Sequence, residues 1–302
     1  TELVVRENDT EDILKEKVKV ATILGTWQST LTNFKYLNKK WKENCEEERL
    51  LGVSMTGIMD NELTNGKTDG LKELLHNLKQ VAIDTNAQWA KKLDINPSVA
   101  ITCVKPSGTV SQLVDSASGI HARHSQYYIR TVRADKKDPL AKMMKDVGFP
   151  CEDDVTKPNH TAVYSFPVQG PKNGVGVYRT DRSAVEQLEL WKVYQDNWCE
   201  HKPSVTISVK EDEWMNVGAW VYDNFEYMSG VSFLPFADHT YRQAPYQDCS
   251  KAEYEKLVAS MPKNVDWEVK LAEYEHHDTT AGSQELACSG DTGCEIVDLI
   301  SQ

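Results

Sequence analysis

Strand-like stretches alternate with helix-like stretches along most of this 302-residue chain. The alternation occurs at least five times, and the connections between successive strand-like stretches are too long for tight hairpins. Parallel strands need such connections, because the chain must return to the same end of the sheet before the next strand begins. The pattern therefore favours an α/β fold with a parallel sheet or barrel. It does not distinguish a doubly wound sheet from half of a barrel.

The strand-like stretches are short runs of β-branched and aromatic residues that end at glycine, proline or polar residues. We expect strands at residues 49–57, 98–104, 127–133, 161–166, 204–209 and 230–235. Before the first of them, Ile13, Val20, Leu24 and Trp27 recur at helical spacing. This spacing predicts a helix whose apolar side covers the sheet. A second apolar helical face is predicted from Leu71, Leu74, Leu75, Leu78, Ala82, Thr85 and Trp89.

The stretch Lys-Pro-Ser-Gly-Thr at residues 105–109 joins a predicted strand to a segment that can begin a helix. Ser107 and Thr109 supply hydroxyl groups, and Gly108 allows backbone N–H groups to come close to a ligand. Because the start of a helix also favours anions, we predict a phosphate site at Ser107, Gly108, Thr109 and Val110. The spacing of a Walker loop is absent, and an ordinary β-turn is the alternative interpretation.

Composition limits the classes of partner. The net charge of −12 argues against nucleic acid and against an anionic membrane surface as partners, but it allows a nucleotide that needs only a few local donors. No apolar run is long enough to span a bilayer, and no secretory signal is visible. The seven Cys are scattered without a Cys-x-x-Cys pair, and a chain of this length is not typical of a secreted disulfide scaffold, so a reducing cytoplasm is the expected location.

Two cysteines near the end of the sequence could form a redox pair. Cys288 and Cys294 are separated by Ser-Gly-Asp-Thr-Gly, which is flexible enough to bring the two sulfur atoms together. A terminal dithiol of this kind suits thiol–disulfide exchange. Incidental exposed cysteines are one alternative. A zinc site that adds His276 and His277 is another, although adjacent histidines fit one tetrahedral site poorly.

His121, Arg123 and His124 lie close together shortly after the Pro-Ser-Gly-Thr turn. Arg123 could offer paired donors to a phosphate or carboxylate, and a loop held together by these side chains is the structural alternative. No Ser/His/Asp order, His-Glu-x-x-His motif or Gly-x-Gly-x-x-Gly motif after a strand is present. We therefore expect neither a hydrolase nor a Rossmann-type domain.

Several segments together resemble one enzyme family. One matching block covers residues 105–133, and its most specific part runs from Lys-Pro-Ser-Gly-Thr at residue 105 through Ser-Gly-Ile-His-Ala-Arg-His to Ile-Arg at residue 130. The other matching segments are residues 49–60, 203–210, 231–235 and 240–246 and the terminal cysteine pair. They resemble the C-terminal half of the adenosylcobalamin-dependent (class II) ribonucleotide reductases, of the ribonucleoside-triphosphate reductase type.

The resemblance implies a fold and a set of roles. Residues 1–262 would form the C-terminal half of a ten-stranded α/β barrel, and residues 263–302 a mobile redox tail. The Pro-Ser-Gly-Thr turn would hold the phosphates of a ribonucleoside triphosphate, and Cys288 and Cys294 would carry electrons from thioredoxin. His121 and Arg123 become candidate contacts to substrate or cofactor. Adenosylcobalamin would serve the complete enzyme, and no metal site is assigned to this chain.

One element of the family pattern is missing. The sequence contains no Asn-Pro-Cys-x-Glu motif, which in the family forms the thiyl-radical loop and lies N-terminal to where this chain begins. We therefore expect the chain to need the N-terminal half of the reductase as a partner and to be inactive alone. Two alternatives remain. One is a non-catalytic nucleotide-binding or assembly module that requires a partner chain, and the other is an independent enzyme built on His121, Arg123 and His124.

Overall fold

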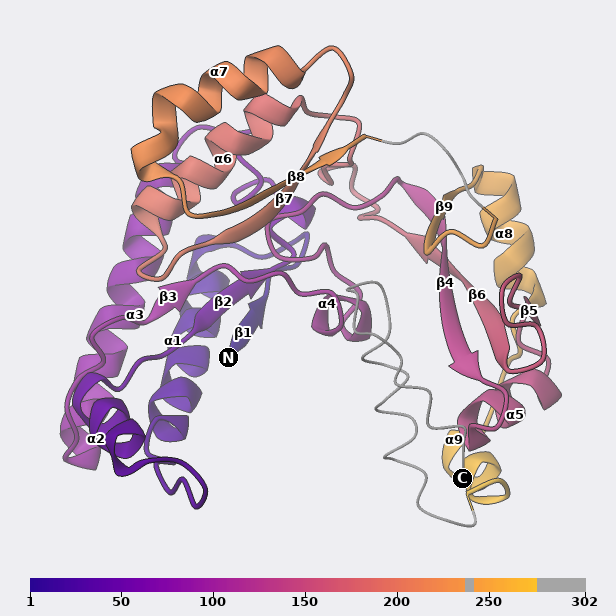
Figure 1. The fold of residues 1–302 in the computed structure, drawn as a ribbon, viewed down its shortest axis with the longest axis horizontal. Helices are drawn as coiled ribbons and strands as arrows, with labels where there is room; N and C mark the ends of the chain where they lie inside the picture. The colour runs from indigo at the N-terminus through magenta and orange to yellow at the C-terminus, as the bar shows by residue number, and fades with distance from the viewer. Residues whose placement is uncertain (237–241, 276–302) are drawn as a thin grey trace. The chain divides into compact units, whose positions relative to one another are not determined.

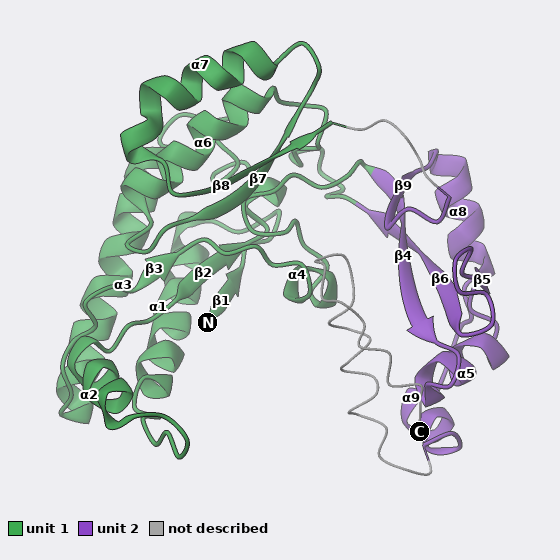
Figure 2. Cartoon of the chain, in the orientation of Figure 1, with its two compact units in different colours: residues 1–126, 170–237 green, residues 127–169, 238–302 purple. Residues whose placement is uncertain are grey.

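A computed structural model of the chain describes residues 1–236 and 242–275 (Figure 1). Its contacts divide the chain into two compact units (Figure 2). Unit 1 comprises residues 1–126 and 170–237, and unit 2 comprises residues 127–169 and 238–302. Both units contain helices and strands, which confirms the predicted mixed α/β class. The predicted boundary between residues 262 and 263 stays a prediction.

Unit 1 contains parallel strands, as the alternation predicted, and it begins with a further strand at residues 2–4. β1 (Glu2–Val4), β2 (Val53–Thr56) and β3 (Thr102–Cys103) form one sheet in that order, with both pairs parallel. β7 (Ser204–Val209) and β8 (Gly230–Pro235) form a second parallel pair. The strands of unit 1 therefore point the same way within each sheet, so their carboxyl ends lie along one edge of each sheet.

The two sheets of unit 1 are linked by a backbone hydrogen bond. The Ser204 N–H donates to the Val104 carbonyl oxygen over 3.1 Å, immediately beyond the end of β3. The helices of unit 1 are α1 (Glu11–Gln28), α2 (Lys39–Glu48), α3 (Leu71–Leu93), α4 (Val110–Leu113), α6 (Ala184–Asn197) and α7 (Trp214–Asn224), with short 3₁₀ turns η1 (Ile58–Asp60) and η2 (Phe225–Tyr227). Figure 1 shows α1 and α3 side by side, and α6 beside α7.

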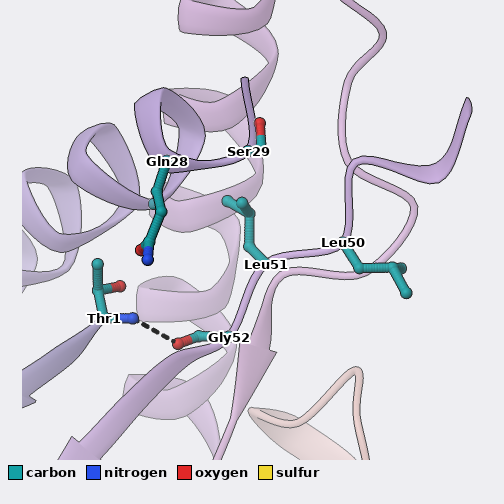
Figure 3. Close-up of a pocket in the computed structure, with 7 residues that line it drawn as sticks. Thr1, Gln28, Ser29, Leu50, Leu51 and Gly52 are labelled. Carbon is teal, nitrogen blue, oxygen red and sulfur yellow. Dashed lines mark hydrogen bonds between the residues drawn. The ribbon is translucent and has the colours of Figure 1, made fainter. Parts of the chain in front are cut away.

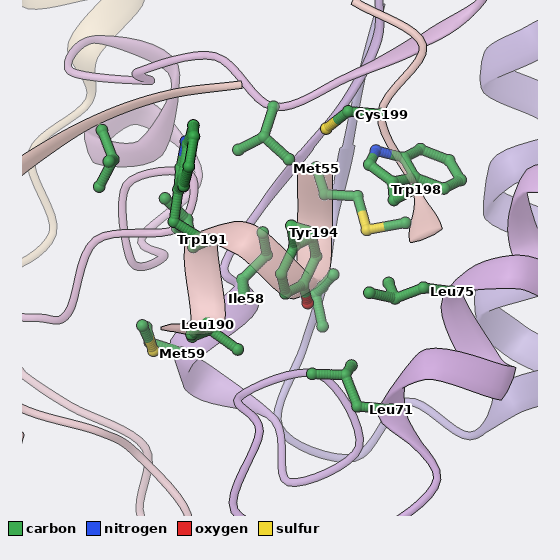
Figure 4. Close-up of a cluster of buried hydrophobic side chains, with 14 of the residues drawn as sticks. Met55, Ile58, Met59, Leu71, Leu75, Leu190, Trp191, Tyr194, Trp198 and Cys199 are labelled. Atoms are coloured by element: carbon green, nitrogen blue, oxygen red, sulfur yellow. The ribbon is translucent and has the colours of Figure 1, made fainter. Parts of the chain in front are cut away.

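Aromatic side chains at the end of α6 form the centre of the unit 1 core (Figure 4). Trp191, Tyr194 and Trp198 are completely buried, and each directs its polar atom to a backbone carbonyl. The Trp198 indole N–H donates to the Cys103 oxygen over 2.8 Å, and the Tyr194 hydroxyl donates to the Thr64 oxygen over 2.7 Å. Large aromatic rings can be buried this deeply because their polar atoms are satisfied.

The predicted apolar side of α1 is wrong. Ile13, Val20, Leu24 and Trp27 are 43–54% exposed. The buried positions are instead Leu14, Val18, Ala21, Thr22, Gly25 and Thr26, which also recur at helical spacing. Small residues let the neighbouring helix approach closely, and the buried threonine hydroxyls donate to carbonyls one turn earlier in the helix. On α3 the predicted face is confirmed from Leu71 to Thr85, whereas Trp89 is only half-buried.

Unit 2 contains an antiparallel sheet in the order β5-β6-β4-β9. Its strands are β4 (Tyr127–Asp135), β5 (Cys151–Asp153), β6 (Thr161–Gln169) and β9 (Tyr246–Asp248). Its helices are α5 (Pro139–Asp146), α8 (Lys251–Ser260) and α9 (Trp267–Ala272). The expectation of parallel strands is therefore wrong for residues 127–133 and 161–166. The long connection between β4 and β6 contains α5 and the edge strand β5, so its length does not require a parallel return.

Among the residues that the structure describes, no helix has both the length and the apolar character needed to cross a membrane.

Gly57 tests the close approach between β1 and β2. Its φ is +81°, and a Cβ there would lie 2.4 Å from the Val5 oxygen. Gly70 has a φ of +93° but no atom within 4 Å of its Cβ position, so it is a matched control. We expect Gly70→Ala to lower the free energy of unfolding by about 1 kcal/mol and Gly57→Ala by roughly 2–4 kcal/mol, because only the latter adds a backbone clash. Denaturant unfolding of both variants measures the difference, and equal losses would contradict the close approach.

Candidate functional site

The Pro-Ser-Gly-Thr turn lies directly beyond the carboxyl end of β3 and before α4, as the sequence predicted. In parallel α/β sheets, ligands bind outside the carboxyl ends of the strands. Gly108, Thr109 and Val110 are exposed, whereas Ser107 is only 5% exposed. The turn therefore has an outer part that a ligand can reach and an inner part that is fixed to the protein.

The outer part of the turn presents unused donors. Within the described residues, the backbone N–H groups of Gly108, Thr109 and Val110 and the Thr109 hydroxyl donate to no acceptor. A Cβ at Gly108 would meet no atom within 4 Å, so space in front of the turn is open. Successive N–H groups that point the same way form a concave site for an oxyanion. Because α4 has only four residues, these donors and not a helix dipole carry the case for phosphate.

Ser107 has a different environment from the one predicted. Its hydroxyl donates to the Glu2 carboxylate over 2.8 Å, and its N–H donates to the Ser118 hydroxyl oxygen over 3.2 Å. Its carbonyl accepts from the Ser111 hydroxyl and N–H. For Ser107 to contact phosphate, its hydroxyl must leave Glu2, and this contact stays a prediction. The nearby Glu2 carboxylate opposes an anion, and the exposed Lys105 favours one.

Residues 115–121 form a loop behind the turn, which we call the backing loop. The Ala117 carbonyl accepts from the Thr56 hydroxyl over 2.9 Å and from the Gly57 N–H over 2.7 Å. The Gly119 N–H donates to the Thr56 hydroxyl oxygen over 2.9 Å. The end of β2 therefore fixes the backing loop through both backbone and side-chain contacts.

Arg123 holds the same loop through an ion pair. Its guanidinium donates to both carboxylate oxygens of Asp60, over 2.8 and 3.1 Å, and to the Asp115 carboxylate over 3.1 Å. The Arg123 and Asp60 side chains are 6% and 5% exposed. Asp60 also accepts from the Ala117 N–H over 2.7 Å. These contacts support a structural role for Arg123, and its predicted contact with substrate or cofactor stays untested.

Sequence reasoning missed Asp60. The signal for it was present, because Asp60 follows the apolar run Gly-Ile-Met directly after β2. A carboxylate in such a run must find a cation or several N–H donors when the segment is buried. The partner, Arg123, lies 63 positions later in the sequence, so the pairing could not be read from spacing.

His121 uses both ring nitrogens inside the protein. Its Nε2 accepts from the Thr206 N–H over 2.9 Å, so Nε2 carries no proton. Its Nδ1 lies 2.9 Å from the Ser118 oxygen and must therefore be the protonated nitrogen that donates. Burial lowers the pKa of His121, although the bond to Ser118 opposes this shift. A neutral imidazole with both nitrogens occupied is not a free acid, base or ligand contact, so the geometry does not support an independent enzyme built on His121.

The cysteine pair and the zinc alternative lie outside the described residues, since Cys288, Cys294, His276 and His277 all belong to residues 276–302. In the described part of the chain, no three His, Cys, Asp or Glu side chains are grouped so that they could hold a metal ion. Burial raises the pKa of the Cys103 and Cys199 thiols. These two cysteines suit packing better than exchange chemistry, because the thiolate is the reactive form.

A small pocket lies at the opposite end of the sheet from the turn (Figure 3). Its volume is about 140 Å³, and residues that line it include Gln28, Leu51 and Gly52. Thr1 and Gly52 directly precede β1 and β2, so the pocket is at the amino ends of these strands. Sites for drug-sized ligands have volumes of about 300–1,000 Å³ and occur at the carboxyl ends of parallel strands. Both its size and its position argue against a substrate site.

The geometry at His121 predicts a pH dependence. Because folding lowers the pKa of His121, its neutral form contributes stability that is fully present above the unfolded pKa of about 6.5 and is lost as pH falls through the folded value. We expect His121→Gln to lose less stability than the unmodified chain between about pH 7.5 and about pH 5.5. Denaturant unfolding at both pH values measures this, with His76→Gln on the exposed side of α3 as the control. An equal pH dependence in all three proteins would contradict the lowered pKa of His121.

The sequence is similar to known proteins over most of its length. No family model matches the chain. The adenosylcobalamin-dependent ribonucleoside-triphosphate reductase of Euglena gracilis is 30% identical over 257 residues, which cover 83% of this chain and 34% of that protein. The protein of the same name from Lactobacillus gasseri is 28% identical over 279 residues, which cover 84% of this chain and 37% of that protein. The chain thus spans little more than a third of the length of these relatives.

The fold comparison points the same way. The crystal structure of a B12-dependent (class II) ribonucleotide reductase matches with a TM-score of 0.75 at 23% identity, over 90% of this chain and 41% of that one. The two sequence relatives and this structure cover nearly the same large share of the chain. Over most of its length, the chain is therefore a relative of the adenosylcobalamin-dependent ribonucleoside-triphosphate reductases and has the fold of part of a class II ribonucleotide reductase.

Proposed function

We propose that the chain is the C-terminal part of a ribonucleotide reductase that converts ribonucleoside triphosphates to 2′-deoxyribonucleoside triphosphates. The observation that carries this proposal is the similarity to reductases of that name over 83–84% of the chain. The unused donors at the Pro-Ser-Gly-Thr turn support it independently, because the substrate of such an enzyme has phosphates to bind. The cytoplasm is the matching location, since the nucleotide pool is there.

The parallel strands of unit 1 support a barrel half as the finer description of the fold. β1, β2 and β3 are parallel, and β7 follows β3 through the Ser204–Val104 hydrogen bond. The remaining strands of the ten-stranded barrel would come from the N-terminal half of the reductase, which we propose as the partner of this chain. The absent Asn-Pro-Cys-x-Glu motif would also belong to that half.

The turn would bind the triphosphate through the N–H groups of Gly108, Thr109 and Val110, with the Thr109 hydroxyl as a further donor. These donors are fixed before the ligand arrives, so little reorganisation is needed on binding. In the tail, Cys288 and Cys294 would pass electrons from thioredoxin or a similar dithiol to the substrate-reducing cysteines of the complete enzyme.

Adenosylcobalamin would serve the complete enzyme as its source of radical chemistry. The pocket of about 140 Å³ is far too small to hold a corrin ring.

A non-catalytic nucleotide-binding or assembly module is the second candidate. The observation that favours it is the exposed apolar side of α1, where Val20, Leu24 and Trp27 are 47–54% exposed. These three side chains recur at helical spacing and so share one side of α1, and exposed apolar side chains grouped in this way suit contact with another protein surface. This candidate shares the partner chain with the first proposal but not the chemistry, so an activity measurement separates them.

Reconstitution is the test of the reductase proposal. We expect the chain alone to show no reduction of ATP or CTP with adenosylcobalamin and a dithiol, and to support turnover once the N-terminal half of a matching reductase is added. Turnover by the chain alone would falsify the need for the missing half. In the active mixture, Cys288→Ser should abolish turnover with thioredoxin and spare turnover with a small dithiol. A mixture that binds nucleotide without turnover would favour the assembly module.

Gly108 tests the phosphate site separately from activity. A carboxylate placed in the open space at Gly108 would repel a triphosphate, whereas a methyl group meets no atom there. We expect Gly108→Asp to weaken triphosphate binding at least about tenfold, and Gly108→Ala to change it less than about threefold. Titration of each variant with CTP by calorimetry gives the two dissociation constants. Equal affinities would remove the turn from the binding site, provided that circular dichroism shows both variants folded.

A further inference from the structure

Three hydrogen bonds in series connect strand β7 to the inner side of the Pro-Ser-Gly-Thr turn at residues 105–109, which we call the phosphate turn below. The Thr206 N–H of β7 donates to His121 Nε2 over 2.9 Å. The Nδ1–H of His121 donates to the Ser118 carbonyl oxygen over 2.9 Å. The Ser118 hydroxyl oxygen then accepts from the Ser107 N–H over 3.2 Å. The only side chains in this series are those of His121 and Ser118.

The backing loop also touches the turn directly. Gly119 has a φ of +55°, and a Cβ there would lie 2.7 Å from the Lys105 carbonyl oxygen. The loop and the turn are therefore in backbone contact next to the Ser118–Ser107 hydrogen bond. A displacement of the backing loop must move the turn as well.

The direction of the Ser107 N–H determines where the next donors point. Ser107 directs its N–H and its hydroxyl inward, to Ser118 and Glu2, while the N–H groups of the next three residues have no acceptor in the described structure. If Ser118 offered no acceptor, the Ser107 peptide could rotate towards solvent and carry the following donors with it. Binding sites lose affinity when their donors must be ordered by the ligand.

We propose that Ser118 is a positioning residue for the phosphate turn, and that His121 fixes Ser118 by tying its carbonyl to β7. This inference rests on the proposed phosphate-binding role of residues 108–110. It assigns His121 to the second layer of the site, where it acts through Ser118 and does not touch the ligand. Of these two residues, Ser118 has the larger effect on the position of the turn, because it contacts the turn itself.

The first test is the affinity for CTP. We expect Ser118→Ala to weaken binding about three- to tenfold, which corresponds to the loss of one neutral hydrogen bond, and Ser118→Thr to restore most of the affinity because it keeps the hydroxyl. Ser260→Ala is the matched control, since the Ser260 hydroxyl bonds only within α8 and the residue is exposed. Equal affinities of Ser118→Ala and the unmodified chain would overturn the proposal.

The second test measures the hydrogen-exchange protection of the turn in the absence of ligand. In the free chain, amide hydrogen exchange measured by NMR should show faster exchange of the Ser107 N–H in Ser118→Ala and in His121→Ala than in the unmodified chain. The Ala117 N–H, which bonds to Asp60, should keep its protection in Ser118→Ala and so reports that the loop is still folded. Unchanged exchange at Ser107 in Ser118→Ala would overturn the positioning role.

The two tests separate this inference from the proposed function. If the unmodified chain binds no CTP, the phosphate site fails and the exchange of the Ser107 N–H still decides the role of Ser118. If the chain binds CTP at the turn but Ser118→Ala changes neither affinity nor exchange, the phosphate site stands and the positioning role is wrong.

Discussion

The buried ion pair between Arg123 and Asp60 holds the candidate site together. Both side chains are at most 6% exposed, and the guanidinium meets both carboxylate oxygens. Removing one partner of such a pair leaves an uncompensated buried charge, which costs about 3–5 kcal/mol. Because Asp60 also accepts from the Ala117 N–H, this pair fixes η1 and the backing loop at the same point. That loop contacts the Pro-Ser-Gly-Thr turn, because the Ser107 N–H donates to the Ser118 hydroxyl oxygen.

The polar groups of the candidate site fall into two sets: unused donors at the surface, and hydrogen-bonded groups behind them. The turn can leave the donors of Gly108 and Val110 unused at the surface because the polar groups behind them are satisfied by Ser118, Thr56 and Asp60. Glycine is required where backbones meet behind the turn: a side chain at Gly57 or Gly119 would strike a carbonyl oxygen within 3 Å. In the proposed phosphate site, rigidity would therefore come from residues that need not contact the ligand.

The sequence predicted local features, such as strands and helix faces, better than it predicted which distant residues contact one another. Alternation identified the parallel strands of unit 1, and the leucine spacing identified the buried face of α3, because both patterns follow directly from backbone geometry. The same reasoning misplaced the face of α1, since it weighted large apolar residues over the small ones that pack. It predicted the turn, but it could not show that the Ser107 hydroxyl meets Glu2, because these residues are 105 positions apart. The antiparallel sheet of unit 2 was missed for a similar reason: connection length alone does not fix strand direction.

Burial favours the protonated form of three thiols in the described part of the chain. The cysteines there with a shifted pKa are Cys103, Cys199 and Cys249, and burial raises the pKa of each. A raised pKa reduces the thiolate fraction at neutral pH, and the thiolate is the form that attacks a disulfide. These three thiols are therefore poorly suited to electron transfer, whereas the turn at Gly108 is well suited to holding phosphate. Under the proposed function, the turn would bind phosphate, whereas the proposed redox pair, Cys288 and Cys294, lies in another part of the sequence.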